Sequence, residues 1–266
     1  MDVFQELFRV RLLRRLMRTV FAYFTLIVLT PLFGGIALLA ALLGLPDGPG
    51  SVFDRMLRWW ARGLLWASGV KVVVHGDENR RAESQVFVAN HVSRFDILAL
   101  ASQLRHIKFV AKAELARIPV FGRGARAVGT LYIQRDKRQS SFETYREAAA
   151  QIGDGASVVI FAEGTRSPSY ALRPFKKGPF VLAISAKAPI VPTVVHGALY
   201  VQPKGTMRVR SGRIDVHFLE PVPVAGLTHE DRDRLASTVR ERIAVVLRDS
   251  YGIESPPWEP RRHQGS

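Results

Sequence analysis

A histidine and an aspartate five residues apart, His91 and Asp96, are the residues of this chain best suited to acid–base chemistry. A neutral imidazole accepts a proton at one nitrogen when a carboxylate holds the other nitrogen as N–H. On a continuous helix this separation would leave the two side chains about 140° apart around the axis, so a tight turn must bring them together. We expect His91 to act as a general base and Asp96 to orient it. The alternative is an ordinary helix N-cap followed by a structural histidine.

The flanking residues place this pair between two regular elements. Val86–Ala89 reads as a buried strand, and the apolar run that starts at Ile97 opens a helix. Of the seven histidines, only His91 has a plausible carboxylate partner nearby in the sequence. The chain has no cysteine and no Gly-x-Ser-x-Gly elbow, which argues against a covalent acyl-enzyme. The histidines show no close ligand spacing, so we also expect no metal.

Basic residues follow two further strands. Arg135 ends an apolar strand in Gly129–Arg135, where its guanidinium could bind a phosphate or simply be solvated. A second turn follows the strand that ends near Phe161, and it contains Glu163, Gly164, Thr165 and Arg166. Its glycine permits close backbone approach and its arginine can meet an anion, although Glu163 and Arg166 could form a structural ion pair. Cations in Arg173–Gly178 precede a helix start. These clusters indicate a phosphate-bearing ligand.

The formal charge of +15 in 266 residues requires a polyanionic partner or surface. Nucleic acid and anionic lipid are the two choices. No zinc finger or aromatic RNA-binding signature accompanies the charge, whereas a long uncharged apolar stretch does. We therefore expect an anionic membrane surface, and no nucleic acid, as the partner.

The apolar stretch, Thr19–Leu45, is 27 residues without a charge and long enough to cross a bilayer. Pro31 and the pair Gly34–Gly35 divide it, so it could be one kinked span or a hairpin that enters the membrane and returns. Arginines flank both ends, which favours a re-entrant hairpin over residues 19–45 with the rest of the protein on the cytoplasmic face. The flanking residues are Arg9, Arg11, Arg14, Arg15 and Arg18 before it, and Arg55, Arg58 and Arg62 after it.

The segment after the hairpin has an apolar stripe at helical spacing, from Phe53 to Leu64. It could lie in the membrane interface, with Trp59, Trp60 and Trp66 near the headgroups, or it could pack against the protein core. We assign residues 1–68 to basic and hydrophobic membrane-associating helices.

From Val70 onward, strands alternate with helices. The predicted strands are Val70–Val74, Val86–Ala89, Lys108–Val110, Leu131–Ile133, Val158–Ala162, Ile190–Val194 and Arg213–Phe218; the predicted helices are Ile97–Leu104, Phe142–Gln151, Pro179–Ala186 and Glu230–Arg248. This order predicts an α/β domain over 69–252, with a mostly central β-sheet flanked by helices. A mobile tail over 253–266 is expected to follow it, because that segment is rich in proline and poor in aliphatic residues.

Four blocks then carry a family resemblance. His91–Asp96, Gly129–Arg135, Phe161–Ser167 and Ile190–Val194 occur in the order, and at roughly the spacing, of the blocks of the glycerolipid acyltransferase family. The chain most resembles the bacterial 1-acylglycerol-3-phosphate O-acyltransferase branch. One residue departs from the family pattern: Ala162 stands where the family usually carries proline, which removes some loop rigidity but no chemical group.

The resemblance implies acyl transfer from acyl-CoA or acyl-carrier protein to the sn-2 hydroxyl of a lysophosphatidic acid, with no cofactor. It implies His91 and Asp96 as the catalytic pair. It implies substrate-binding roles for Lys112, Arg135, Glu163, Gly164, Thr165 and Arg166. We expect direct transfer, with backbone N–H groups near the turn stabilising the oxyanion. The implied location is the cell inner membrane, with the catalytic domain facing the cytoplasm.

Other readings stay open. Within the same chemistry the acceptor could be a lyso-ornithine lipid or another lysophospholipid, and the basic clusters could bind the phosphates of CoA. Outside enzymes, the chain could be a lipid-binding protein with a degenerate pocket. Gly122–Ala127 also contains glycines at a spacing found in nicotinamide-binding domains, but it lacks a clear preceding strand and the acidic residue expected about 20 residues on.

Overall fold

A single β-sheet of strands in the order β1-β7-β6-β2-β5-β3-β4 forms the centre of the computed structural model, which describes residues 2–81, 83–134 and 138–258. The strands are β1 (Val70–His75), β2 (Val86–Ala89), β3 (Ile107–Lys112), β4 (Leu131–Ile133), β5 (Ser157–Phe161), β6 (Ile190–His196) and β7 (Gly212–Phe218). All seven predicted strands are present, and the predicted α/β class is confirmed.

Strand pairing explains why loops distant in sequence meet. All neighbours are parallel except β6 and β7, which are antiparallel. β2 lies between β5 and β6. The carboxyl ends of β2, β3 and β5 therefore reach the same edge of the sheet, where loops of parallel sheets build sites. Every residue of β2 is buried, as expected for a strand covered on both faces.

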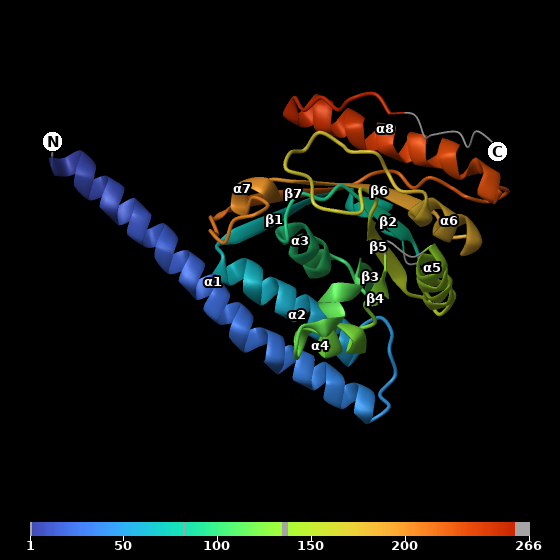
Figure 1. The fold of residues 1–266 in the computed structure, drawn as a ribbon, viewed down its shortest axis with the longest axis horizontal. Coiled ribbons are helices and arrows are strands. Elements are labelled where there is room, and N and C mark those ends of the chain that lie inside the picture. The colour runs from blue at the N-terminus through green and yellow to red at the C-terminus, as the bar shows by residue number, and fades with distance from the viewer. Residues whose placement is uncertain (1, 82, 135–137, 259–266) are drawn as a thin grey trace.

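Helices cover both faces of the sheet (Figure 1). They are α1 (Asp2–Leu42), α2 (Val52–Ala67), α3 (Phe95–Gln103), α4 (Phe121–Ala127), α5 (Arg138–Gly153), α6 (Gly178–Ser185), α7 (Ala198–Val201) and α8 (Arg232–Tyr251), with short 3-10 turns at Asp77–Asn79, Ala113–Arg117 and His229–Asp231. Residues of α2, α3 and α7 share one core with Phe87 and Ala89. Residues of α5, α6 and α8 share the other with Val86 and Val88. The alternation along β2 thus assigns its side chains to two cores.

Helix α1 overturns the predicted hairpin. It is one helix from Asp2 to Leu42 that runs through Pro31 and both glycines. Gly34 makes a packing contact rather than a turn, since a Cβ on Gly124 of α4 would lie 2.9 Å from the Cα of Gly34. The chain reverses later, in residues 43–51, and α2 returns along α1. Figure 1 shows α1 passing α2 and α4 while its N-terminal part extends away from the rest of the molecule.

Two other expectations are corrected. The apolar stripe of α2 faces inward, with Phe53, Met56 and Leu64 buried, so the core-packing alternative holds for that stripe. The prediction of a mobile tail is wrong for residues 253–258, because Ile253 and Trp258 pack against the core beside α8. Residues 259–266 lie outside the described residues. The helices α4 and α7 were not predicted. They have 7 and 4 residues, which is too short to show a helical period of apolar residues.

Candidate active site

The turn after β2 is fixed by Asn90, the first residue beyond the strand. Its side-chain oxygen accepts from the N–H of Val195 at 2.8 Å, and its amide nitrogen donates to the carbonyl of the same residue at 3.1 Å. Both bonds join the ends of β2 and β6. Ser93 then ties the turn to the segment after α7 by donating to the carbonyl of Gln202 at 2.8 Å. The backbone that carries His91 is therefore held from two sides.

The predicted pair meets in this turn. His91 Nδ1 lies 2.8 Å from Asp96 Oδ2. The same oxygen accepts from the backbone N–H groups of Val92 and Ser93 at 2.7 and 2.8 Å, and the Asp96 side chain has no exposed surface. An ionised carboxylate only accepts, so Nδ1 carries the proton and Nε2 has a free lone pair. Among the described residues, no group hydrogen-bonds Nε2.

Glu163 lies behind His91. Its Oε1 accepts from the backbone N–H of His91 at 3.0 Å, and its Oε2 accepts from the N–H of Arg173 at 3.3 Å. Burial raises the pKa of Glu163 to about 7, although both hydrogen bonds act to lower it. Glu163 is only 4% exposed and forms no ion pair with Arg166, which was the structural alternative. It therefore holds the turn rather than lining the cavity.

These contacts revise the expected oxyanion site. The N–H groups of His91, Val92 and Ser93 all donate to carboxylates of the protein. The prediction that amides near the turn stabilise an oxyanion is thus wrong for these three, because a donor already bonded to a carboxylate has little capacity left for a substrate oxygen. The ring of His91 stacks on Phe161 at 3.9 Å between centroids, which fixes its orientation further.

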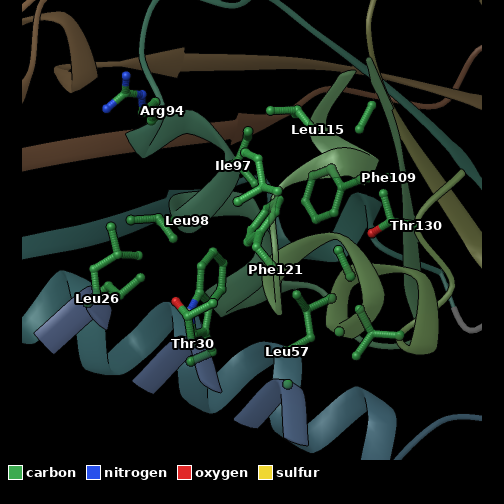
Figure 2. A pocket seen from close by; sticks show the side chains of 18 of the residues that line it. Leu26, Thr30, Leu57, Arg94, Ile97, Leu98, Phe109, Leu115, Phe121 and Thr130 are labelled. Atoms are coloured by element: carbon green, nitrogen blue, oxygen red, sulfur yellow. The ribbon is translucent and has the colours of Figure 1, made fainter. Parts of the chain in front are cut away.

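An apolar cavity of about 940 Å³ opens beside His91. Its walls come from α1, α2, α3, α4 and β3, and Figure 2 shows Leu26, Leu57, Ile97, Phe109 and Phe121 facing one another across it. The cavity is large enough for an acyl chain, since ligand pockets span roughly 300–1,000 Å³. Helix α1, predicted only as a membrane segment, therefore also forms a wall of the cavity.

Three cationic side chains and one hydroxyl line the same cavity as His91. Arg94, Lys112, Thr165 and Arg166 all line it, and Figure 2 shows Arg94 at the edge of the apolar group. Burial and the nearby Arg94 lower the pKa of Arg166. No carboxylate in the described part of the chain forms an ion pair with either arginine. Asp96 acts on Arg166 only through its charge, so two guanidinium groups without an ion-paired carboxylate remain to favour an anion such as a phosphate.

The other predicted site residues divide into two groups. Gly164, with φ of 74°, shapes the turn after β5 but does not line the cavity. A side chain there would meet Lys176, and its left-handed conformation suits glycine. Arg135 lies outside the described residues, so its placement is left as a prediction.

Sequence reasoning missed Arg94 and the cavity walls. Arg94 stands between His91 and Asp96, and its place inside the turn was a signal that it would share their surroundings. The walls formed by α1, α2 and α4 had no such signal, because helices far apart in sequence build them.

Two other histidines also meet carboxylates, although neither has one nearby in the sequence. His75 Nε2 lies 2.7 Å from Asp215 Oδ1, and His106 Nε2 lies 3.7 Å from Asp47 Oδ1. Both partners are distant in sequence, so local spacing could not reveal them. Across the ranges that the structure describes, no group of three or more histidine, cysteine and acidic residues is arranged to hold a metal ion.

The nicotinamide-binding alternative finds no support in the fold. Gly122–Ala127 lies in α4, which follows the 3-10 turn Ala113–Arg117 rather than a strand. Gly124 packs against α1, and a Cβ on Gly122 would lie 2.1 Å from the carbonyl oxygen of Ala116. These glycines allow close helix packing and leave no phosphate-binding strand-to-helix turn.

Comparison with known proteins gives consistent results. A family model described as Acyltransferase matches residues 71–196. The chain is 32% identical over 199 residues to 1-acyl-sn-glycerol-3-phosphate acyltransferase alpha of Homo sapiens, covering 73% of this chain and 70% of that protein. It is 30% identical over 240 residues to a putative 1-acyl-sn-glycerol-3-phosphate acyltransferase of Caenorhabditis elegans, covering 88% and 82%.

A solved structure extends the similarity to the N-terminal helices. The crystal structure of the 1-acyl-sn-glycerophosphate acyltransferase from Thermotoga maritima aligns with a TM-score of 0.77 at 26% sequence identity. The alignment covers 92% of this chain and the whole of that one. The shared architecture therefore includes more than the segment matched by the family model.

Proposed function

The chain belongs to the 1-acyl-sn-glycerol-3-phosphate acyltransferase family, and on that premise we propose that it acylates the sn-2 hydroxyl of 1-acylglycerol 3-phosphate to give phosphatidic acid. The observation that carries this proposal is the arrangement around His91. Its Nδ1 is held by Asp96, its Nε2 is open, and it lines an apolar cavity next to Arg94 and Arg166.

The chemistry is a direct transfer in a ternary complex. Nε2 of His91 takes the proton of the acceptor hydroxyl as that oxygen attacks the thioester carbonyl carbon. A carbon–oxygen bond forms, the carbon–sulfur bond breaks, and the imidazolium returns the proton to the leaving thiolate. Asp96 keeps the imidazole in the required tautomer and stabilises the imidazolium. The thioester is itself the activated donor, so the scheme needs no cofactor.

The positions of the cations and of the apolar walls indicate where the phosphate and the acyl chain of the acceptor bind. Arg94 and Arg166 receive the phosphate, and Lys112 and the Thr165 hydroxyl, which line the same cavity, are further donors. The acyl chain of the acceptor or of the donor occupies the apolar cavity. The donor is acyl-CoA or acyl-carrier protein, and the same cations, which line the cavity together with His91, can bind the phosphate groups of either one.

Helix α1 can anchor the enzyme to a membrane. Its segment Arg15–Leu42 is long and apolar enough to cross a bilayer, and only 11% of its most apolar part is buried in the protein. One side packs on α2 and α4, while Phe24, Leu32 and Leu39 on the other side are more than half exposed. We propose that α1 lies in the membrane at the cytoplasmic face of the inner membrane without crossing it, because basic residues flank both ends of its apolar stretch and a crossing helix would put one basic flank outside.

A product assay tests the reaction. The purified protein is incubated with lysophosphatidic acid, lyso-ornithine lipid and other lysophospholipids, each with acyl-CoA and with acyl-carrier protein, and products are identified by mass spectrometry. Phosphatidic acid from lysophosphatidic acid is the expected product. Acylation of a different acceptor alone would reassign the substrate, and no product from any pair would favour a lipid-binding protein.

A sedimentation assay tests the anchor. Asp replacements at Phe24 and Leu39 place charges on the exposed side of α1 and should release most of the protein from anionic phospholipid vesicles. The matched control places Asp at Thr238 and Ser250, two exposed polar residues of α8. Equal sedimentation of both double variants would contradict the assignment of α1 as the anchor.

A further inference from the structure

The segment Ser255–Trp258, which follows α8, lies against the loop between β5 and α6. Ser255 Oγ accepts from the N–H of Leu172 at 3.0 Å. The indole of Trp258 lies 6.2 Å from the ring of Phe175, which is buried in the core beside α6. The segment Ser255–Trp258, which we call the C-terminal strap, therefore contacts the loop through backbone and side chains.

Arg240 of α8 joins the strap to the same loop. One of its terminal nitrogens donates to the carbonyl of Leu172 at 3.0 Å and to the carbonyl of Pro256 at 2.8 Å, and its guanidinium lies 5.7 Å from the ring centroid of Trp258. Arg240 is only 5% exposed, and its Nε has no partner among the described residues. Burying a guanidinium is costly, and its bonds to two backbone carbonyls offset part of that cost while tying the loop to the strap.

The contacts continue to the catalytic base. Leu172 is held at its N–H by Ser255 and at its carbonyl by Arg240. The next residue, Arg173, uses its N–H to bond one oxygen of Glu163. The other oxygen of Glu163 accepts the N–H of His91. The strap is thus linked to the backbone of His91 through one loop and one buried carboxylate.

We propose that Arg240 and the C-terminal strap are positioning groups for the active site, holding Leu172 and Arg173 so that Glu163 fixes the backbone of His91. This inference rests on the proposed function only in naming His91 as the base. A shift of about 1 Å in a catalytic group can cost on the order of 100-fold in rate. Loss of the strap should therefore lower kcat, while KM for the lysolipid, which is set by the cavity and the cations, should change little.

The first test compares Arg240→Met with Arg242→Met. Arg242 is the matched control, because it lies on the same helix and donates to one backbone carbonyl, that of Glu220. We expect Arg240→Met to lower kcat at least about tenfold with KM within about twofold, and the control to match the parent enzyme. Equal kcat in all three, measured well below each melting temperature, would overturn the proposal.

A second pair of variants, at Ser255, makes a smaller change and keeps the proposal testable if the Arg240 variant fails to fold. Ser255→Ala removes the bond to Leu172, and Ser255→Thr restores a hydroxyl. We expect a fall of about threefold in kcat for alanine and recovery for threonine. The pH–rate profile of Ser255→Ala should also move to higher pH, since a looser Arg173 N–H no longer lowers the pKa of Glu163. A lower melting temperature with unchanged kcat and profile would show a purely structural role.

Amide hydrogen exchange makes the test independent of activity. In Ser255→Ala and Arg240→Met, the peptides that contain Arg173 and His91 should both exchange faster than in Arg242→Met. Faster exchange in the peptide that contains Leu172 and Arg173, without faster exchange in the peptide that contains His91, would overturn the link to His91. If the parent protein forms no product from any acceptor, the proposed function fails, yet the exchange data still decide whether the strap positions His91.

Discussion

Two histidine–aspartate pairs in this molecule have nearly the same geometry and different surroundings. His91 and Asp96 are 2.8 Å apart beyond β2, and His75 and Asp215 are 2.7 Å apart on β1 and β7. Asp96 is fully buried and also holds two backbone amides, whereas Asp215 is 13% exposed and also binds Arg213. The histidine–aspartate distance alone therefore does not identify a base.

The open nitrogen and its surroundings make the difference. His91 bonds through Nδ1 and lines the cavity with Nε2 open. His75 bonds through Nε2, stacks on His217 at 4.2 Å, and does not line the cavity. A general base needs a free lone pair within reach of the substrate hydroxyl, and only His91 combines that with a substrate-sized space.

The strongest test replaces each histidine with alanine. His91→Ala removes the proton acceptor and should lower kcat at least about 100-fold. His75→Ala should leave kcat within about twofold, because it removes a partly exposed contact far from the cavity. Both are measured with a radiolabelled acyl donor and lysophosphatidic acid. Near-normal transfer by His91→Ala would make the base assignment wrong, and a large loss in His75→Ala would break the distinction between the pairs.

A smaller effect is expected when each aspartate becomes asparagine. Asp96→Asn loses the charge that orients and stabilises His91. Its amide nitrogen must either face two backbone N–H donors or occupy the buried Oδ1 position, which has no partner among the described residues. We expect kcat to fall by up to about 100-fold, because the imidazole is no longer held in the productive orientation. Asp215→Asn should retain kcat within about twofold. Similar kcat values for the two variants would show that the buried carboxylate does not orient His91.

The two pairs also show which parts of the site were readable from sequence. Asp96 follows His91 in one turn, and Val86–Ala89 and Phe161 mark strand ends through their apolar runs, so the position of the site at one sheet edge was predictable. The partner of His75 is Asp215, which meets it only because β1 and β7 are neighbours. Strand order was not encoded in any local pattern, so this pair could not be foreseen.

The same limit explains the error in α1. Pro31 and Gly34 are local signals for a break, and sequence alone favoured a hairpin. The structure uses Gly34 to let α1 approach α4, a contact between distant helices that has no sequence signature. Hydrophobicity predicted that the segment avoids water, but it could not tell lipid from a cavity wall, and α1 borders a cavity as well as exposing apolar side chains.

Glu163, which bonds the backbone of His91, and Asp215, which bonds the ring of His75, should have opposite effects on stability as pH changes. Burial raises the pKa of Glu163 from 4.5 to about 7, so the folded state holds a proton that the unfolded state releases. Stability from this residue is greatest below pH 4.5 and falls as pH rises to about 7. For Asp215, burial acts to raise the pKa, but the bonds from Arg213 and His75 outweigh it and lower the pKa. Its contribution is present above the unfolded pKa and is lost as pH falls.

Thermal unfolding in detergent from pH 4 to 8 measures this difference. Replacing Glu163 with glutamine should remove a fall in unfolding free energy of at most about 3 kcal/mol across the window from 4.5 to about 7. Asp215→Asn should keep the slope of the parent across that window but lower stability by a similar amount throughout it, because the Asp215 contribution is lost only below the unfolded pKa of 3.8. A parent protein whose stability does not decline relative to Glu163→Gln across that window would contradict the raised pKa.

The smallest effect is expected where the chain departs from the family pattern. The N–H of Ala162, just beyond β5, donates to the carbonyl of Ala89 at 3.3 Å, and Ala89 leads directly into the turn of His91. Ala162→Pro removes that long bond and should lower unfolding free energy by about 1 kcal/mol or less, because a net backbone hydrogen bond contributes little more. Asn90 and Glu163 still hold the turn through four other bonds, so kcat should stay within about threefold of the parent. A tenfold loss in a kinetic assay, with the melting temperature nearly unchanged, would mean that the end of the strand itself positions His91, a restraint for which the His75 pair has no counterpart.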